Sequence, residues 1–205
     1  MKYVILVGDG MGDYPVKELG GKTLLQAARI PNMRRIAAAG EVRMVNTIPD
    51  NLPPGSDVAN LGLLGYNAAE NYTGRAPIEA AGAGIPMSPN DVAFRCNLVT
   101  IKNGIMDDYS AGHITTEEGR ALLRELDQQL GRKGLRFHGG VSYRHLLIWE
   151  NGPVRISTTP PHDITGQPIT SYLPKGERQD EVRALIEKSE NMICDHPVNQ
   201  DHGHN

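Results

Sequence analysis

The stretch "YVILVGDGMGD", residues 3–13, indicates the class of fold. Its first five residues form an unbroken apolar, β-branched run, which is typical of a strand buried on both faces in a parallel sheet. A glycine-rich turn follows. Thr23 then stands as the N-cap of a helix over "LLQAAR", and Pro31 begins another helix that Gly40 ends. Because residues 41–48, "EVRMVNTI", have the pattern of a second strand, the order strand, helix, strand predicts an α/β domain.

The pattern changes after a Gly/Pro/Asn-rich passage that ends near residue 84. We expect a hairpin from "DVAFRCNLVTI" through "KNG" to "IMDDYSAG", and a single strand over "GVSYRHLLIWENG". "TTPPHDITGQPI" is expected to be loop. These features predict a second, smaller α+β unit inserted into the first. The expected division is 1–76, 77–193 and a tail, 194–205.

Two helices are expected in the second unit. Thr115 and Glu118 have the spacing of a capping box. The helix that follows presents one apolar face and ends at Gly131; the face is formed by Leu122, Leu123, Leu126 and Leu130. A last amphipathic helix carries Val182, Leu185, Ile186 and Ile193.

Composition excludes several classes of partner. The chain has 205 residues, 39% hydrophobic and 22% charged, as in ordinary globular proteins. A net charge of -3 and 5% aromatic residues argue against a nucleic-acid surface. No segment is long and apolar enough to predict a membrane span, and the two cysteines, Cys96 and Cys194, show no metal or disulfide spacing. We expect a cytoplasmic protein with reduced thiols.

Asp9 follows the first expected strand, where ligands bind in open α/β sheets. With glycines around it, its carboxylate is a natural ligand for a hard cation. It could equally stabilise the turn through its own backbone. The GxGxG spacing also admits a dinucleotide loop, although the usual fingerprint is GxGxxG.

Ser56 lies in "PPGSDVAN", where Gly55 precedes a helix-like segment that Gly65 ends. A helix N-terminus stabilises an alkoxide or a phosphate, and it also favours serine as the N-cap. Both interpretations fit the residue. A nucleophilic serine needs a base or a metal to activate it, and no GxSxG elbow is present.

Basic residues occur in several polar clusters, namely Arg75 in "TGRAPIEA", Arg95 in "FRCN", Arg144 in "SYRH" and His113 in "SAGHI". Arginine binds phosphate and carboxylate through paired hydrogen bonds, although a lone surface arginine is commonly only solvated. His162 and Asp163 are adjacent in "PPHDITG" and could position a substrate or close their own loop. The tail could bind a transition metal or be a frayed end; its candidates are Asp195, His196, Asp201, His202 and His204.

Seven ordered motifs resemble the archaeal-type cofactor-independent phosphoglycerate mutases of the alkaline phosphatase superfamily. The resemblance runs from residue 1 to about residue 200. The motifs are "VGDGMGD", "PPGSDVANLGLLGYN", "YTGRAPIEAAGAG", "AFRCNL", "DYSAGHI", "GVSYRHLLIW" and "PPHDITG".

The resemblance implies an alkaline-phosphatase-like parallel-sheet core with an inserted α+β domain. It makes Asp9 a metal ligand, and Ser56 both a metal ligand and the residue that takes up the phosphoryl group. Arg95, His113 and Arg144 are similar to substrate-contacting positions, with His113 the candidate acid/base; Arg75, His162 and Asp163 are further substrate-binding candidates. The implied cofactor is Mn²⁺, Mg²⁺ or Zn²⁺, and the substrate is a small phosphorylated carboxylic acid, phosphoglycerate.

The chain departs from this family where the second half of the first domain is expected. In the family, that half carries most of the metal ligands. The resemblance therefore implies an incomplete metal site and an exposed sheet edge. We expect either a homo-oligomer or a complementing chain to cover that edge. The alternatives are a related phosphotransferase acting on a substrate such as homoserine, and a catalytically inactive remnant that binds a partner.

Overall fold

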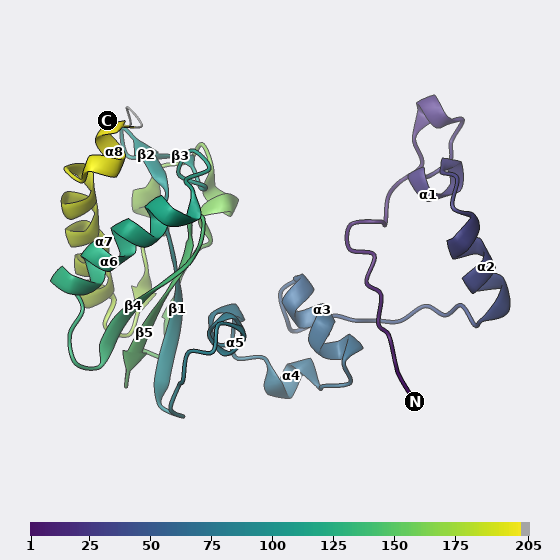
Figure 1. Cartoon of the computed structure of the whole chain (residues 1–205), viewed down its shortest axis with the longest axis horizontal. Coiled ribbons are helices and arrows are strands. Elements are labelled where there is room, and N and C mark those ends of the chain that lie inside the picture. The colour runs from purple at the N-terminus through teal and green to yellow at the C-terminus, as the bar shows by residue number, and fades with distance from the viewer. Residues whose placement is uncertain (202–205) are drawn as a thin grey trace. The chain divides into compact units, whose positions relative to one another are not determined.

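The computed structural model describes residues 1–201 of the chain, which divides into two compact units, Met1–Tyr72 and Thr73–Asn205. Figure 1 colours the first unit purple to blue and the second blue-green to yellow. The fold is mixed α/β with small sheets. Among the described residues, no helix combines the length and the apolar character needed to cross a bilayer.

Unit 1 consists of short helices joined by extended chain. The predicted N-cap at Thr23 is confirmed, since its hydroxyl accepts a hydrogen bond from the Gln26 N–H and the Gln26 side chain completes the capping box. The helix that begins at Pro31 and ends before Gly40 is also confirmed. The helical elements are η1 (Lys17–Leu19), α1 (Leu24–Ala27), α2 (Pro31–Ala39), α3 (Ser56–Leu63) and α4 (Ala68–Asn71).

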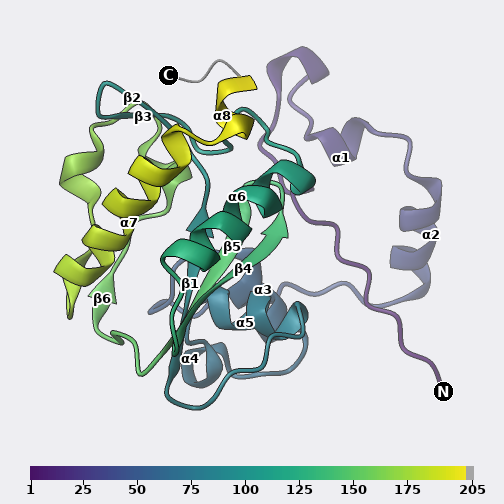
Figure 2. The same ribbon diagram turned by 60° about the vertical axis from the view of Figure 1, so that its left-hand side comes forward.

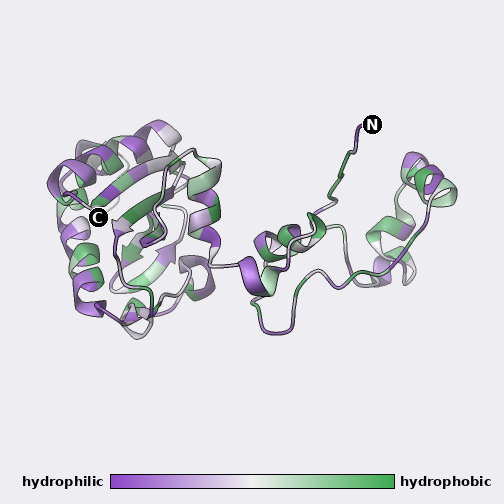
Figure 3. Ribbon diagram, turned by 90° about the horizontal axis from the view of Figure 1, so that it is seen from below, coloured by the Kyte–Doolittle hydropathy of each residue, from purple (hydrophilic) through white to green (hydrophobic). Residues whose placement is uncertain are grey.

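The two strands expected in unit 1, at residues 3–7 and 41–48, are not formed. Their side chains are largely in solvent: Leu6 is 89% exposed and Met44 99%. A strand needs a neighbour for its backbone hydrogen bonds, and a parallel sheet needs cover on both faces; neither is present in the described part of unit 1. Figure 3 shows green, apolar positions along this uncovered N-terminal chain. The apolar pattern was recognised correctly, but the strand prediction is wrong for this structure.

Unit 2 is built on a three-stranded antiparallel sheet with the order β1-β5-β4. In register, Arg95 of β1 lies opposite Leu146 of β5, which lies opposite His138 of β4. The elements of the unit are α5 (Arg75–Gly82), β1 (Asp91–Asn97), β2 (Thr100–Lys102), β3 (Ile105–Asp108), α6 (Thr116–Gln129), β4 (Leu135–Val141), β5 (Arg144–Glu150), β6 (Ile156–Ser157), η2 (Pro161–Ile164), η3 (Ile169–Tyr172), β7 (Lys175–Gly176), α7 (Gln179–Cys194) and α8 (Pro197–Asp201).

The central strand β5 is covered on both faces. Leu147 and Trp149 pack into the larger core with the leucines of α6 and Val182 of α7. Leu146 and Ile148, which alternate with them, pack on the other face against α5. Figure 2 shows α6 and α7 side by side over the larger core's face of the sheet. Since neighbouring residues of a strand point to opposite faces, the apolar run of β5 contributes side chains to both cores.

Two β predictions need correction. "GVSYRHLLIWENG" is not one strand, because it contains the turn between β4 and β5 at Ser142 and Tyr143, where Ser142 has φ +52°. The predicted hairpin is confined to β2 and β3, which the Asn103-Gly104 turn joins with positive φ at both residues. Strand β1 leaves this hairpin and pairs with β5 instead, because its alternate side chains contribute to both cores.

The helix predictions of unit 2 are confirmed. α6 begins with the Thr115–Glu118 capping box and buries Leu122, Leu123 and Leu126, and α7 spans the last predicted amphipathic segment. The stretch expected to be only loop contains the 3-10 helix η2 and begins η3.

His145 is a buried histidine under α6, only 2% exposed. Its Nδ1 accepts a hydrogen bond from the Gly140 N–H at 3.0 Å, so the neutral ring carries its proton on Nε2, which has no partner among the described residues. Gly119 makes room for this ring: a Cβ there would lie 3.1 Å from Nε2 and 2.5 Å from the Ser142 carbonyl oxygen. Burial, helped by the Arg120 charge, lowers the pKa of His145 to about 4.

Acid should therefore destabilise unit 2 through His145. Since the unfolded chain takes up this proton near pH 6.5 and the native chain only near pH 4, the free energy of unfolding falls by roughly 3 kcal/mol as the pH drops through that window. Urea unfolding between pH 7 and pH 4 measures this. His145→Gln should remove the slope, and the matched control His138→Gln should keep it. An unchanged slope in His145→Gln would assign the acid sensitivity to other groups.

Candidate functional site

Ser56 is the first residue of α3, and Gly55, not Ser56, is its N-cap. The serine side chain makes no capping hydrogen bond, and its hydroxyl has no partner among the described residues. The helix-cap interpretation is therefore wrong. The exposed hydroxyl lies in the first turn, where free N–H groups favour negative charge. Its neighbour Asp57 accepts a hydrogen bond from the Tyr72 hydroxyl at 2.6 Å, which ties the start of α3 to the chain after α4.

Asp9 lies in an exposed turn of the same unit, followed by Gly10 with φ +74°. Its carboxylate accepts no hydrogen bond within the described chain, so it does not close the turn through its backbone. No hydrogen bond joins it to Ser56. Within residues 1–201 there is also no group of three or more His, Cys, Asp or Glu residues that could hold a metal ion. These residues alone do not fit the implied divalent cation.

In unit 2, Arg75 and Arg95 converge on one carboxylate, that of Glu79. The Arg75 Nε lies 2.8 Å from Glu79 Oε1 within α5, and the Arg95 Nε lies 3.3 Å from Glu79 Oε2. The second contact is an ion pair without hydrogen-bond alignment, and the Arg95 Nε is buried with no hydrogen-bond partner. Two guanidinium groups around one carboxylate leave a local positive charge, which suits an anionic ligand.

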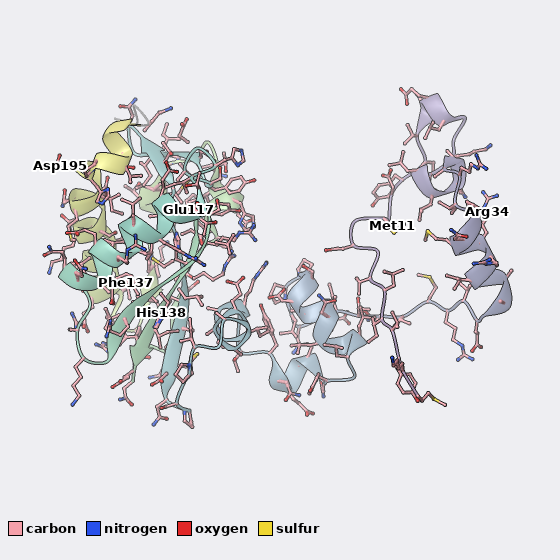
Figure 4. The ribbon with its side chains drawn as sticks, in the orientation of Figure 1. Met11, Arg34, Glu117, Phe137, His138 and Asp195 are labelled. Carbon is pink, nitrogen blue, oxygen red and sulfur yellow. The ribbon has the colours of Figure 1, made fainter. Side chains whose placement is uncertain are left out.

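Arg144 joins this group through the register of the sheet. It lies opposite Asn97, and Arg95 lies opposite Leu146, so Arg95, Asn97 and Arg144 share the face that packs on α5. His138, half-buried on β4, completes the Arg95 row across the sheet. Figure 4 labels His138 beside Phe137 on this strand. We call Arg75, Glu79, Arg95, Asn97, His138 and Arg144 the arginine face.

His113 is held by a carboxylate-closed turn. It is exposed, with φ +57°, in the loop between β3 and α6. Asp108 starts this loop and accepts hydrogen bonds from the Ser110 N–H (2.8 Å), the Ser110 hydroxyl (2.7 Å) and the Gly112 N–H (2.7 Å). Burial acts to raise the pKa of Asp108, but these hydrogen bonds and the nearby charge of His113 outweigh it and hold the pKa below its ordinary value.

The β4–β5 turn, which precedes Arg144, is tied to the loop that carries His113. The Ser142 hydroxyl donates to the Ile114 carbonyl at 2.7 Å, and the Ser142 N–H donates to the Thr116 hydroxyl at 3.1 Å. His113 directly precedes the first of these contacts, and Arg144 lies two residues after Ser142. These two hydrogen bonds fix the backbone next to His113 and the turn that precedes Arg144.

An aromatic chain extends the neighbourhood to His162. The Arg144 guanidinium lies 5.2 Å from the Tyr143 ring centre, Tyr143 meets Tyr109 edge to face at 5.9 Å, and Tyr109 meets the His162 ring at 6.1 Å. His162 Nε2 lies 3.4 Å from Asp163 Oδ1, and both side chains are more than half exposed. The structure thus gathers Arg75 and Arg95 around Glu79, and it links Arg144 to His162 and Asp163 through Tyr143 and Tyr109.

Three residues of this site escaped the sequence prediction: Glu79, Asn97 and His138. Asn97 follows Arg95 by two residues, which is the spacing that puts both on one face of a strand, so this signal was available. Glu79 lies at i+4 from Arg75. His138 required the pairing of β4 with β5, which the sequence did not reveal.

Two of the tail candidates have described side chains, and for Asp201 only the backbone, at the end of α8, is described. Asp195 and His196 follow α7, and Nδ1 of His196 accepts a hydrogen bond from the Val198 N–H at 3.2 Å. His202 and His204 lie outside the described residues.

Removing the Asp108 charge should loosen the His113 turn. In Asp108→Asn the acceptor for Ser110 and Gly112 is weaker, so their amide hydrogens should exchange roughly tenfold faster. Hydrogen exchange resolved by NMR measures this. Asp107→Asn is the matched control, since Asp107 pairs with Lys102 outside the turn and should leave these two amides unchanged. Unchanged exchange in Asp108→Asn would show that the backbone alone holds the turn.

Comparisons with known proteins agree on one family. Residues 37–199 match the family model described as 2,3-bisphosphoglycerate-independent phosphoglycerate mutase. A curated protein of that name from Methanosarcina barkeri is 56% identical over 200 residues, which covers 97% of this chain and 50% of that protein. A protein from Geobacter sulfurreducens, named as a probable mutase of this kind, is 48% identical, again over 50% of its length.

Solved structures give the same result. The chain is similar to the cofactor-independent phosphoglycerate mutase of Thermoplasma acidophilum, with a TM-score of 0.54, 30% identity, and coverage of 94% of this chain and 52% of that one. A protein of Pyrococcus horikoshii gives a TM-score of 0.66 at 28% identity, covering 94% and 44%. The chain spans about half the length of the curated relatives it matches. By its motifs, its family match and its relatives, this chain belongs to the 2,3-bisphosphoglycerate-independent phosphoglycerate mutase family.

Proposed function

We propose that this chain supplies the phosphoryl-accepting serine and the substrate-binding unit of a metal-dependent phosphoglycerate mutase, which interconverts 3-phosphoglycerate and 2-phosphoglycerate. The observation that carries the proposal is the free hydroxyl of Ser56 at the first position of α3, in a chain of this family. A serine that caps its helix would have its oxygen engaged. Ser56 instead offers an unengaged nucleophile beside N–H groups that stabilise an oxyanion.

In the proposed reaction, the Ser56 oxygen forms a bond to the phosphorus of 3-phosphoglycerate as the bond from phosphorus to the C3 oxygen breaks. The serine proton passes by way of a general acid/base, for which His113 is the candidate, to the leaving C3 oxygen. The glycerate then turns, and its 2-hydroxyl attacks the phosphoserine. This second step returns the proton and releases 2-phosphoglycerate, so Ser56 ends as it began.

The arginine face supports the part assigned to unit 2. Arg95 and Arg144 suit the carboxylate and the phosphate of the substrate, because guanidinium groups make paired hydrogen bonds to both. Arg75 shares Glu79 with Arg95 and would hold that guanidinium in place. His162 and Asp163 are exposed at the end of the aromatic chain, where we assign them a secondary contact with substrate.

The proposal requires a second polypeptide segment. Asp9 and Ser56 are the metal ligands that the resemblance gives this chain, and the described residues hold no cluster that would complete a site. The relatives are about twice as long. We propose that a segment equivalent to their remaining half supplies the other ligands for Mn²⁺, Mg²⁺ or Zn²⁺. The same segment would complete an alkaline-phosphatase-like parallel core, with residues 3–7 and 41–48 as strands.

The exposed apolar side chains of unit 1 support this pairing. They run without a break through residues 3–7 and recur at Val42, Met44 and Val45, and their exposure to water is unfavourable. We place the protein in the cytoplasm, where its two cysteines, both free in the structure, stay reduced.

Ser56→Ala should abolish turnover and covalent labelling together. We expect the chain to show mutase activity in an enolase-coupled assay with Mn²⁺ when it is combined with the complementary half of a relative. Intact-mass measurement should then find one added phosphoryl group on the wild-type chain and none on Ser56→Ala. Ser88→Ala, an exposed serine of unit 2, is the matched control and should behave as wild type.

Activity that survives Ser56→Ala would overturn the proposal. A phosphoserine formed without release of 2-phosphoglycerate would favour a related phosphotransferase. If binding occurs with no turnover under any complementation, the chain is an inactive, partner-binding member of the family, which the missing metal cluster would explain.

Leu6→Asp tests the pairing surface. Because Leu6 is 89% exposed, the change should alter the free energy of unfolding of the isolated chain by no more than about 0.5 kcal/mol. It should nevertheless lower the affinity for the complementary half at least tenfold. Val154→Asp is the control, since Val154 is 77% exposed in unit 2. Fluorescence anisotropy of the labelled complementary half measures the affinity of each variant, and urea unfolding measures the stability of each. Equal affinities for the two variants would exclude residues 3–7 from the interface.

A further inference from the structure

The side chain of Asn97 carries a buried oxygen with no partner. Its Oδ1 is shielded from solvent and accepts no hydrogen bond from any described residue. Buried acceptors are almost always satisfied, because an unmade hydrogen bond costs free energy. An unpaired acceptor inside a polar cluster is available to a donor from outside the chain.

The surroundings of this oxygen define what that donor is attached to. Asn97 lies opposite Arg144 and on the same face of β1 as Arg95, whose buried Nε also lacks a hydrogen-bond partner. The acceptor is thus flanked by two guanidinium groups. Glu79 is already occupied by Arg75 and Arg95. A ligand that satisfies the three residues must carry anionic oxygens for the arginines and an O–H or N–H donor for the asparagine.

The strand itself holds the backbone around Asn97 in place. Asn97 is the last residue of β1, and the next residue continues the ladder, since the Leu98 N–H donates to the Tyr143 carbonyl at 2.9 Å. On the opposite face of the sheet, Cys96 packs against the larger core. The backbone on both sides of Asn97 is therefore fixed.

We propose that Asn97 accepts a hydrogen bond from the free hydroxyl of the bound hydroxy acid and so selects hydroxylated phosphocarboxylates. This inference rests on the proposed function and adds a specificity residue to it. Phosphoryl loss leaves the glycerate with hydroxyls at C3 and C2, and the C2 hydroxyl, already free in 3-phosphoglycerate, is the one that later attacks. A residue that binds this hydroxyl would help to hold the glycerate between the two steps. The contact would add to those that the arginines make with the carboxylate and the phosphate.

The test compares two ligands on the full chain by NMR titration. 3-Phosphoglycerate and 3-phosphonooxypropionate share a phosphate and a carboxylate on a three-carbon chain, and the second lacks the hydroxyl. Wild type should bind the hydroxylated ligand roughly tenfold more tightly, the effect of one neutral hydrogen bond together with an acceptor otherwise left unsatisfied. Amide signals of Arg95, Asn97 and Arg144 should report the binding.

In Asn97→Ala the preference should fall to about one, because the affinity for the hydroxylated ligand drops while that for the other ligand stays the same. Asn90→Ala is the matched control, since Asn90 is exposed beyond the other end of β1, and it should keep the preference. A stability measurement distinguishes a structural role of Asn97 from a binding role. Because the substitution removes an unsatisfied acceptor, the urea midpoint of Asn97→Ala should be unchanged or higher.

The outcomes distinguish this inference from the proposed function. If 3-phosphoglycerate shifts none of the amides of unit 2, the placement of substrate on the arginine face fails, and this inference fails with it. If the ligand binds there and Asn97→Ala keeps the tenfold preference, only the role of Asn97 is overturned. A lower urea midpoint for Asn97→Ala would assign the residue to the fold and would also overturn the inference.

Discussion

The alternation of side chains along β5 is the constraint on which unit 2 depends. Leu147 and Trp149 stabilise the core under α6 and α7, while Leu146 and Ile148 stabilise the core under α5. A shift of one residue in the pairing would exchange the two sets and bury the wrong side chains. The same register decides which polar residues meet, because Arg144 begins this strand on the α5 face, opposite Asn97. The packing of the two cores and the arrangement of the arginine face therefore depend on the same strand register.

Local signals in the sequence predicted local structure well. The N-cap at Thr23, the capping box at Thr115 and the leucine face of α6 are all predicted from spacing within one helix. Such features depend on neighbours three or four residues apart, which the sequence displays directly. The turn between β4 and β5 is not predicted because neither of its residues, Ser142 and Tyr143, is a glycine, asparagine or aspartate, although Ser142 adopts a positive φ there.

Features that depend on distant segments could not be predicted in this way. The run at residues 3–7 has strand composition, but a strand exists only where another backbone accepts its hydrogen bonds, and unit 1 offers none in the described chain. Likewise, Arg95 and Arg144 were singled out separately, and only the pairing of β1 with β5 places them on one face. Ser56 shows the reverse case: its residue type fits a cap, yet the helix begins one residue earlier than a serine cap would require.

Gly119 shows how an absent side chain can set a distance. The α6 backbone approaches the Ser142 carbonyl so closely there that a single methyl group would lie 2.5 Å from the oxygen. The turn that precedes Arg144 and the loop that ends at His113 are joined across this contact by the two hydrogen bonds of Ser142. The separation between the turn before Arg144 and the loop that carries His113 therefore depends on the absence of a side chain at position 119. Any larger residue at position 119 would push the Ser142 turn away from α6.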